Sequence, residues 1–172
     1  SADTTITDDS DVTTVSLSAT PTVVEGGTIT YTATLTNPAG NDVTVNLSNG
    51  QSITITAGNV TGTVDVTASD DVYQGGDSES VTISSTSGGN FESLSVDPTS
   101  ADTTITDDSD VTTVSLSATP TVVEGGTITY TATLTNPAGT DVTVNLSNGQ
   151  SITITAGNVT GTVDVTASDD VY

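Results

Sequence analysis

Apolar and polar residues alternate along short segments throughout this chain, and the alternation restricts it to β-structure. The segment TITYTATLT, residues 28–36, places Ile29, Tyr31, Ala33 and Leu35 on one face and threonines on the other. A period of two residues with one apolar face is typical of antiparallel sheets that bury one side. The alternation recurs in six further segments, whose expected inward-facing residues are Val15, Leu17 and Ala19; Val43, Val45 and Leu47; Ile53 and Ile55; Val64, Val66 and Ala68; Val81 and Ile83; and Leu94, Val96 and Ile105.

Turn residues separate these segments. Asn49-Gly50 is a strong signal for a tight hairpin, and NPAG at 37–40, TAGN at 56–59 and SGGN at 87–90 mark further turns. About seven short strands within roughly 100 residues are typical of sandwiches of two sheets. The sequence therefore predicts an all-β fold of the immunoglobulin-like antiparallel β-sandwich type.

The chain also repeats itself. Ser1–Tyr73 aligns with Ser100–Tyr172, an offset of 99 residues, and the two copies differ only at Asn41 and Thr140. A repeat of this length corresponds to a whole domain in tandem. Copies this similar have had little room to acquire separate binding specificities, which favours a role in reach or multivalency.

The offset predicts how the chain divides into domains. We interpret residues 1–10 as the final strand of a preceding repeat, 11–109 as a complete sandwich and 110–172 as a partial second repeat. The second copy lacks counterparts of residues 74–99. We therefore expect that further chain or a neighbour completes it.

The charge balance excludes several functions. The chain has 22 acidic residues, no Lys, Arg or His, and a formal net charge of −22. Nucleic-acid binding and polybasic attachment to a membrane both need cationic side chains. No apolar run is long enough to insert directly into a membrane, and the lack of Cys rules out disulfides and thiolate metal sites.

Catalysis is not expected either. The chain offers no His, Cys or Lys as general base or nucleophile. Paired carboxylates can hydrolyse glycosides, but clustered acids at one end of a sandwich suit a cation better. We therefore expect neither an enzyme nor a small-molecule substrate.

The strand directions gather acidic residues at one end of the repeat. If successive strands alternate in direction, the turn with Glu25, the loop 69–79 and the segment after Ile105 meet at the same end, and Asp42 and Glu92 lie at the other. A pair of like charges ~4 Å apart costs about 1 kcal/mol even in water. Without a cationic side chain, the natural remedy is a hard divalent ion such as Ca²⁺, which takes six to eight oxygen ligands. A solvated turn is the alternative for any single aspartate.

We therefore predict one to three Ca²⁺ ions at each repeat junction. The expected ligands are Asp8, Asp9, Asp11, Glu25, Asp70, Asp71, Asp77, Glu79, Asp107, Asp108, Asp110, Glu124, Asp169 and Asp170.

Part of the sequence resembles a known family. The segment DDVYQGGDSESVTISS, followed by a last strand ending in TITDD, is similar to the Calx-β pattern. That resemblance implies that Asp70, Asp71 and Asp77 are loop ligands of calcium and that Asp107 and Asp108 are terminal ones. Glu25 in VVEGG stands where the family usually has a ligating glutamate. The segment QGGDSE departs from the family, which more often has two or three consecutive acids there.

The near-identical acidic repeats resemble the extender repeats of giant RTX adhesins of Gram-negative bacteria. The RTX nonapeptide GGxGxDxUx is absent. The resemblance implies type I secretion and an extracellular position at the bacterial cell surface. We expect a structural extender that calcium stiffens at junctions with adjacent repeats of the same chain. The alternative is an adhesive module whose threonine-rich strand face binds ice or glycans.

Overall fold

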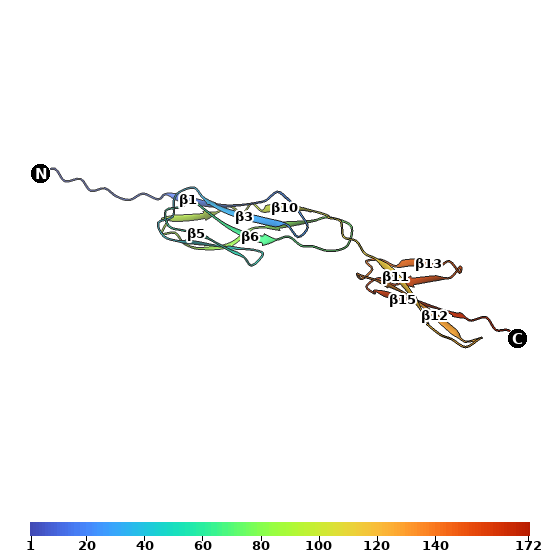
Figure 1. Cartoon of the computed structure of the whole chain (residues 1–172). Coiled ribbons are helices and arrows are strands. Elements are labelled where there is room, and N and C mark those ends of the chain that lie inside the picture. The colour runs from blue at the N-terminus through green and yellow to red at the C-terminus, as the bar shows by residue number, and fades with distance from the viewer. The chain divides into compact units, whose positions relative to one another are not determined.

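The computed structural model describes all 172 residues as two units, Ser1–Asp108 and Ser109–Tyr172 (Figure 1). Strands β1 to β10 belong to the first unit and β11 to β15 to the second. The structure has no helix of the length and apolarity needed to cross a membrane. The predicted all-β sandwich is confirmed.

One layer of the first unit is a four-stranded sheet in the order β6-β3-β1-β9. In this sheet β3 is antiparallel to both β1 and β6, and its Tyr31 lies opposite Ala19 and Val64. The short β9 joins the outer edge of β1 in the parallel direction. The bounds are β1 Val12–Ala19, β3 Thr28–Leu35, β6 Thr61–Thr67 and β9 Ser93–Val96.

The other layer combines the sheets β5-β4-β8 and β2-β10-β7. They are continuous along the chain because only Thr82 separates β7 from β8. The pairing of β4 with β8 shifts register between Asn46 and Leu47, which is typical of a β-bulge. Next to this shift, the backbone N–H of Thr82 donates to the Ser48 hydroxyl, and the Thr82 carbonyl accepts from the Ser48 N–H. The bounds are β5 Ser52–Ile55, β4 Val43–Leu47, β8 Ile83–Gly88, β2 Thr22–Val24, β10 Ala101–Thr106 and β7 Asp77–Val81.

The first and last strands of the repeat each divide between the two layers, which the alternation did not predict. Pro21 lies between β1 and β2, and Pro98 lies between β9 and β10. Proline lacks the N–H that a ladder needs and restricts the residue before it. Each strand therefore pairs on both sheets, and β10 lies parallel to β2.

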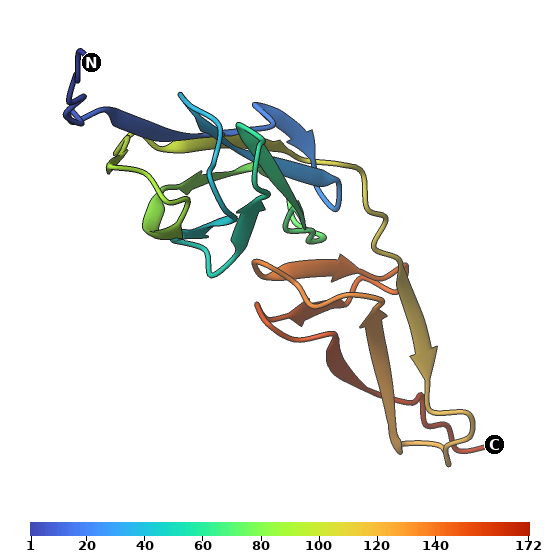
Figure 2. The same ribbon diagram turned by 90° about the vertical axis from the view of Figure 1, so that its left-hand side faces the viewer.

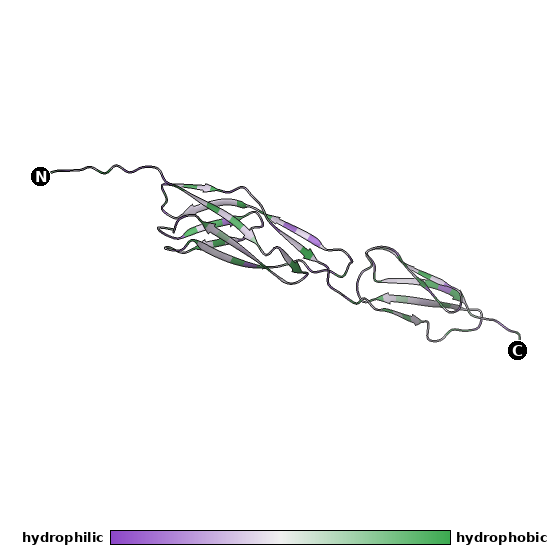
Figure 3. Ribbon diagram, turned by 90° about the horizontal axis from the view of Figure 1, so that it is seen from above, coloured by the Kyte–Doolittle hydropathy of each residue, from purple (hydrophilic) through white to green (hydrophobic).

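The core of the first unit consists mainly of the predicted inward faces. Ile29, Tyr31, Val45 and Ile53 are fully buried between the layers. The alternation of apolar and polar residues is visible along the strands in Figure 3. The exception is Val96, which the alternation placed inside and which is exposed at the end of the edge strand β9.

The second unit is an open sandwich. The sheet β11-β12-β15 packs against the hairpin β13-β14 around Ala132, Leu134, Ile152 and Ile154 (Figure 2). The strands of this unit correspond to β1, β3, β4, β5 and β6 of the first unit. The bounds are β11 Val114–Ala118, β12 Thr127–Leu134, β13 Val142–Asn145, β14 Ser151–Ile154 and β15 Thr160–Thr166.

Residues 1–10 form no strand and are exposed. Residues 2–7 nevertheless have the same sequence as β10, ADTTIT. Ile6 is 91% exposed, whereas its counterpart Ile105 is 2% exposed because β10 pairs with β2 and β7. The interpretation of residues 1–10 as the last strand of a preceding repeat stays a prediction.

Candidate cation site at one end of the first unit

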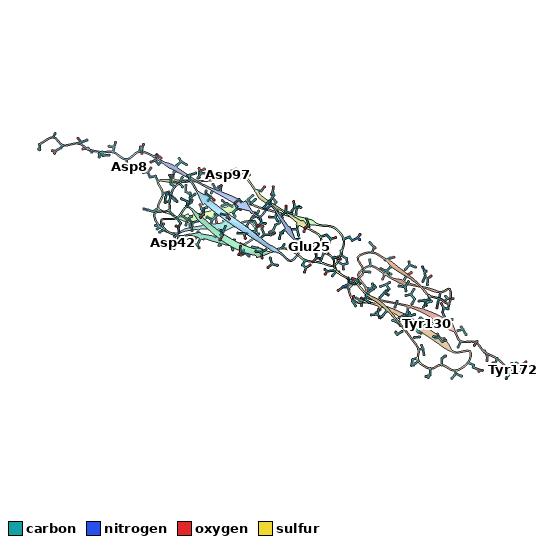
Figure 4. The ribbon with its side chains drawn as sticks, turned by 45° about the horizontal axis from the view of Figure 1, so that its top comes forward. Asp8, Glu25, Asp42, Asp97, Tyr130 and Tyr172 are labelled. Atoms are coloured by element: carbon teal, nitrogen blue, oxygen red, sulfur yellow. The ribbon has the colours of Figure 1, made fainter.

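Three carboxylates from separate parts of the chain converge at one end of the first unit. Oxygen atoms of Glu25, Asp70 and Asp108 all lie within 4.8 Å of one another. Glu25 follows β2, Asp70 follows β6 and Asp108 follows β10, as the count of strand directions predicted. Figure 4 shows Glu25 at this end of the unit, and Asp8 and Asp42 toward the opposite end.

Glu25 is the centre of the group because it is buried. Its side chain is 7% exposed, and its Oε2 atom has no hydrogen-bond partner. Its backbone N–H donates to the Thr106 carbonyl (3.0 Å), and the backbone N–H of Asp108 donates to its carboxylate. Glu25 is therefore fixed against the segment through which the chain leaves the sandwich.

A glycine allows this close approach. Gly26 has a φ of +69°, a left-handed conformation, and its N–H donates to the Ser69 carbonyl (3.2 Å). A Cβ atom at Gly26 would lie 3.4 Å from Oδ2 of Asp70. Gly26 therefore allows the turn after β2 and the loop after β6 to bring Glu25 and Asp70 together.

The local electrostatics disfavour the ionised form of Glu25. Burial raises the pKa of the Glu25 carboxyl, and the charges of Asp71, Asp107 and Asp108 raise it further, against the lowering effect of the Asp108 N–H. The chain has no cationic side chain to compensate. A buried oxygen without a partner, in an all-oxygen donor set, fits a hard divalent cation.

Three other predicted ligands lie around this group and order its loops. Oδ1 of Asp71 accepts from the Tyr73 N–H (2.7 Å), and Oδ2 of Asp107 accepts from the Gly75 N–H (3.2 Å). Asp77 begins β7 and lies opposite Ile105 in β10. These contacts hold the loop between β6 and β7 against the end of β10.

Glu79 is positioned differently from the other predicted ligands. It is half-buried in β7 on the same face as Val81, opposite the buried Thr103. Its carboxylate lies beside the buried hydroxyl of Tyr31, and burial, followed by the Glu79 charge, raises the pKa of Tyr31 to about 12. Glu79 thus lies within strand β7 and points into the sandwich, whereas the sequence placed it in the loop 69–79.

A second acidic group lies at the opposite end of the first unit. Oxygens of Asp8, Asp9 and Glu92 lie within 4.8 Å of one another, and the Asp11 N–H donates to Glu92. Glu92 was not predicted as a ligand, although the strand directions placed it at this end. All three side chains are exposed, and this group contains no buried atom without a partner. It is therefore a weaker candidate than the group around Glu25.

The second unit shows the same turn without the site. Glu124, the counterpart of Glu25, is exposed. Asp169 still lies near the turn, with Oδ2 3.8 Å from a Cβ atom at Gly125, and Oδ1 of Asp170 accepts from the Tyr172 N–H (2.9 Å). The counterpart of Asp108 is missing, so the buried carboxylate requires the exit segment. Asp110 belongs to neither acidic group.

The fold defines this chain as an all-β protein of two sequence-related units. A family model described as the LapA domain matches residues 11–108 and 110–172, so the chain belongs to the LapA domain family. LapA is a large bacterial adhesin, which makes this chain part of an adhesin that acts at the cell surface. No curated protein matches the chain. The match does not extend to the Calx-β pattern, RTX character or type I secretion, which stay predictions.

Proposed function

We propose that this chain is a structural extender of an adhesin, and that Ca²⁺ bound at the end of each complete sandwich stiffens the array. One observation carries the proposal. Glu25 is buried with a carboxylate oxygen that has no partner, within 4.8 Å of oxygens of Asp70 and Asp108. The role is structural, and export by type I secretion would place the domain where calcium is plentiful.

A cation would remove the main electrostatic cost at this end of the domain. Burial of a polar group without a partner is unfavourable, and burial of an unpaired charge is more so. Here the chain buries Glu25 beside Asp70, Asp71, Asp107 and Asp108 and supplies no positive side chain. A divalent ion among these oxygens would stabilise the ionised Glu25 and offset the repulsion.

Calcium fits the donor set better than other common ions. The site offers carboxylate oxygens from three separate loops, and Ca²⁺ accepts six to eight oxygen ligands in flexible geometry. Mg²⁺ requires near-ideal octahedral geometry and gives up its waters reluctantly, and Zn²⁺ or copper prefers His or Cys. Extracellular calcium modules bind at about 10⁻⁴–10⁻³ M, a range in which the ion is bound only outside the cell.

The positions of the ligands explain how the ion would stiffen the array. Glu25 belongs to the turn after β2, Asp70 to the loop after β6, and Asp108 to the segment that leads out of the domain. An ion held by all three would tie the exit segment to the sandwich. The direction in which the chain leaves the domain would then be fixed, and a series of such domains would extend an adhesive tip from the cell.

The experiment is a calcium titration of the whole chain after chelation, followed by calorimetry and by thermal unfolding. The proposal predicts saturable binding of calcium and a higher melting temperature of the complete sandwich. An unchanged melting temperature and no heat of binding would refute it. Magnesium at equal concentration is the control for ion selectivity.

The ligand-binding alternative has less support in the structure. The threonines of β3 form part of the outer face of the sheet, but the Thr30 hydroxyl already donates to Asp65 (2.7 Å). The chain has no Trp and few aromatic residues to stack on sugar rings. Ice or glycan binding therefore remains a prediction for a direct binding assay of the whole chain.

A further inference from the structure

We propose that Asp71 and Asp107 position the ligands of the cation without binding it themselves, an inference that rests on the proposed function. The first unit carries two Asp-Asp pairs at this end, residues 70–71 after β6 and residues 107–108 after β10. In each pair one aspartate is a ligand and its neighbour holds the loop 71–76 in place. The carboxylate ligands of the site are then Glu25, Asp70 and Asp108.

The distances between the carboxylates divide each pair. Oxygens of Glu25, Asp70 and Asp108 lie within 4.8 Å of one another. Asp71 and Asp107 do not belong to this group and accept hydrogen bonds from backbone N–H groups of the loop. Because successive side chains along an extended chain point to opposite sides, neighbouring aspartates are directed toward different partners.

The contact of Asp71 is local. Its Oδ1 atom accepts from the N–H of Tyr73, two residues later, at 2.7 Å, which is the pattern of an Asx turn. The same contact forms in the second unit, where Oδ1 of Asp170 accepts from the Tyr172 N–H at 2.9 Å. Asp71 therefore shapes the turn that begins directly after Asp70.

The contact of Asp107 joins segments that are distant in sequence. Its Oδ2 atom accepts from the backbone N–H of Gly75 at 3.2 Å, across 32 positions of the chain. The loop that begins after Asp70 is thereby tied to the segment that carries Asp108. Asp107 thus acts on the site through the two ligands that it brings together.

Two glycines allow the loop backbone to approach the end of β10. Gly75 has a φ of +117°, which favours glycine, and a Cβ atom at Gly76 would clash with the Ile105 carbonyl oxygen. This approach gives a physical reason for the departure of QGGDSE from the Calx-β pattern. At these positions the loop provides backbone contacts in place of carboxylates.

Two substitutions of Asp107 distinguish a positioning residue from a ligand. Asparagine keeps an oxygen that accepts from the Gly75 N–H but removes the charge, whereas alanine removes both. Asp107→Ala should weaken calcium binding by about 10–100-fold, the usual effect of losing a group that orients a metal ligand. Asp107→Asn should change the affinity by less than about threefold in 1 M salt, where the Debye length is about 3 Å and the lost charge is screened. Equal losses of affinity in the two variants, measured by titration calorimetry, would overturn the proposal.

The neighbouring aspartates are the matched controls. Asp70→Asn and Asp70→Ala should both lose calcium affinity, because a ligand needs its charge as well as its oxygen. Asp71→Asn should keep the affinity as Asp107→Asn does. If Asp70→Asn kept the affinity of the original chain, or Asp71→Asn lost as much as Asp70→Asn, the division of the pair would be overturned.

Trivalent europium, a hard cation that also favours oxygen ligands, reports the ligand set directly. Its luminescence lifetimes in H₂O and D₂O give the number of water molecules bound to the ion, and water replaces a ligand that is lost. At saturation, Asp70→Ala should raise this number and Asp107→Ala should leave it unchanged. A rise in Asp107→Ala as large as that in Asp70→Ala would overturn the proposal.

Amide hydrogen exchange in chelator tests the holding role without any metal. The Gly75 N–H should exchange faster in Asp107→Ala than in the original chain, and Asp107→Asn should restore the slower rate. An unchanged rate in Asp107→Ala would overturn the proposal. Faster exchange in Asp107→Ala, together with no calcium binding by the original chain, would support the holding role and refute the proposed function.

Discussion

The backbone N–H of Asp108 donates to the carboxylate of Glu25, and this contact joins the end of the last strand to the turn after β2. The burial of Glu25 depends on that segment. Glu124 follows the same residues in the second unit, where no such segment is present, and it is exposed. The candidate site therefore forms only when the sandwich is complete.

Calcium should raise the free energy of unfolding of the first unit by an amount that depends on the ratio of the free calcium concentration to Kd. At a free concentration about 100 times Kd, one site contributes about 2.7 kcal/mol. For a domain of this size that corresponds to an increase in melting temperature of about 10–20 °C. Scanning calorimetry at several calcium concentrations measures it, and a shift that does not grow with the logarithm of concentration would contradict a specific site.

Glu25→Gln should separate the cost of the buried charge from the benefit of the ion. In chelator the variant should melt several degrees above the original chain, because it removes an ionised group that burial and three aspartates disfavour. In calcium it should show little further increase, since the central ligand is lost. Glu92→Gln, at the exposed acidic group of the other end, is the matched control and should keep the full calcium shift.

The pH dependence without calcium should follow the raised pKa of Glu25. A carboxyl whose pKa is higher in the folded than in the unfolded state adds stability below its ordinary value of 4.5, and this contribution is lost as the pH rises through the folded pKa. The melting temperature in chelator should therefore increase from neutral pH toward about 4.5. Glu25→Gln should reduce this increase, and an unchanged profile in the variant would assign it to other carboxylates.

At still lower pH the trend should reverse. Hydrogen bonds from Thr99 to Asp97 and from Ser80 to Asp102 lower the pKa of these carboxyls below their ordinary value of 3.8. Their contribution is present above that value and is lost as the pH falls through the lowered pKa. Ser80→Ala should flatten the acid side of the profile without changing calcium binding.

Gly26→Ala should weaken calcium binding as well as folding. The left-handed backbone costs a residue with a Cβ about 1–2 kcal/mol, and relief of that strain would move the turn that carries Glu25, with the new methyl group in contact with Asp70. Gly50→Ala is the control, because Gly50 has a φ of +85° but no atom within 4 Å of a Cβ there. Both variants should lose stability in urea, and only Gly26→Ala should lower the affinity for calcium.

The one position that differs between the copies gives a reciprocal test. Oδ1 of Asn41 accepts from the Gly89 N–H (2.6 Å), and the second unit has Thr140 here and no counterpart of Gly89. Asn41→Thr should destabilise the first unit by about 1 kcal/mol, the usual net value of a hydrogen bond. Thr140→Asn should have no effect on urea unfolding of the second unit, because the added amide has no partner.

The sequence by itself determined the class of fold and most of the core. The alternation in TITYTATLT identified Ile29, Tyr31, Ala33 and Leu35 as buried residues, since a strand turns successive side chains to opposite faces. Counting strand directions was enough to bring Glu25, Asp70 and Asp108 to one end, because antiparallel connection fixes where each loop lies.

The tertiary structure decided the features that depend on contacts distant in sequence. The chain changes from one layer of the sandwich to the other between β1 and β2, and again between β9 and β10. This change depends on sheet pairing between residues more than 80 positions apart, and a proline is its only local signal. The burial of Glu25 is the sharpest case. Glu124 has the same neighbours in sequence, but exposure is set by what covers a residue, and only the complete sandwich brings the end of β10 over the turn.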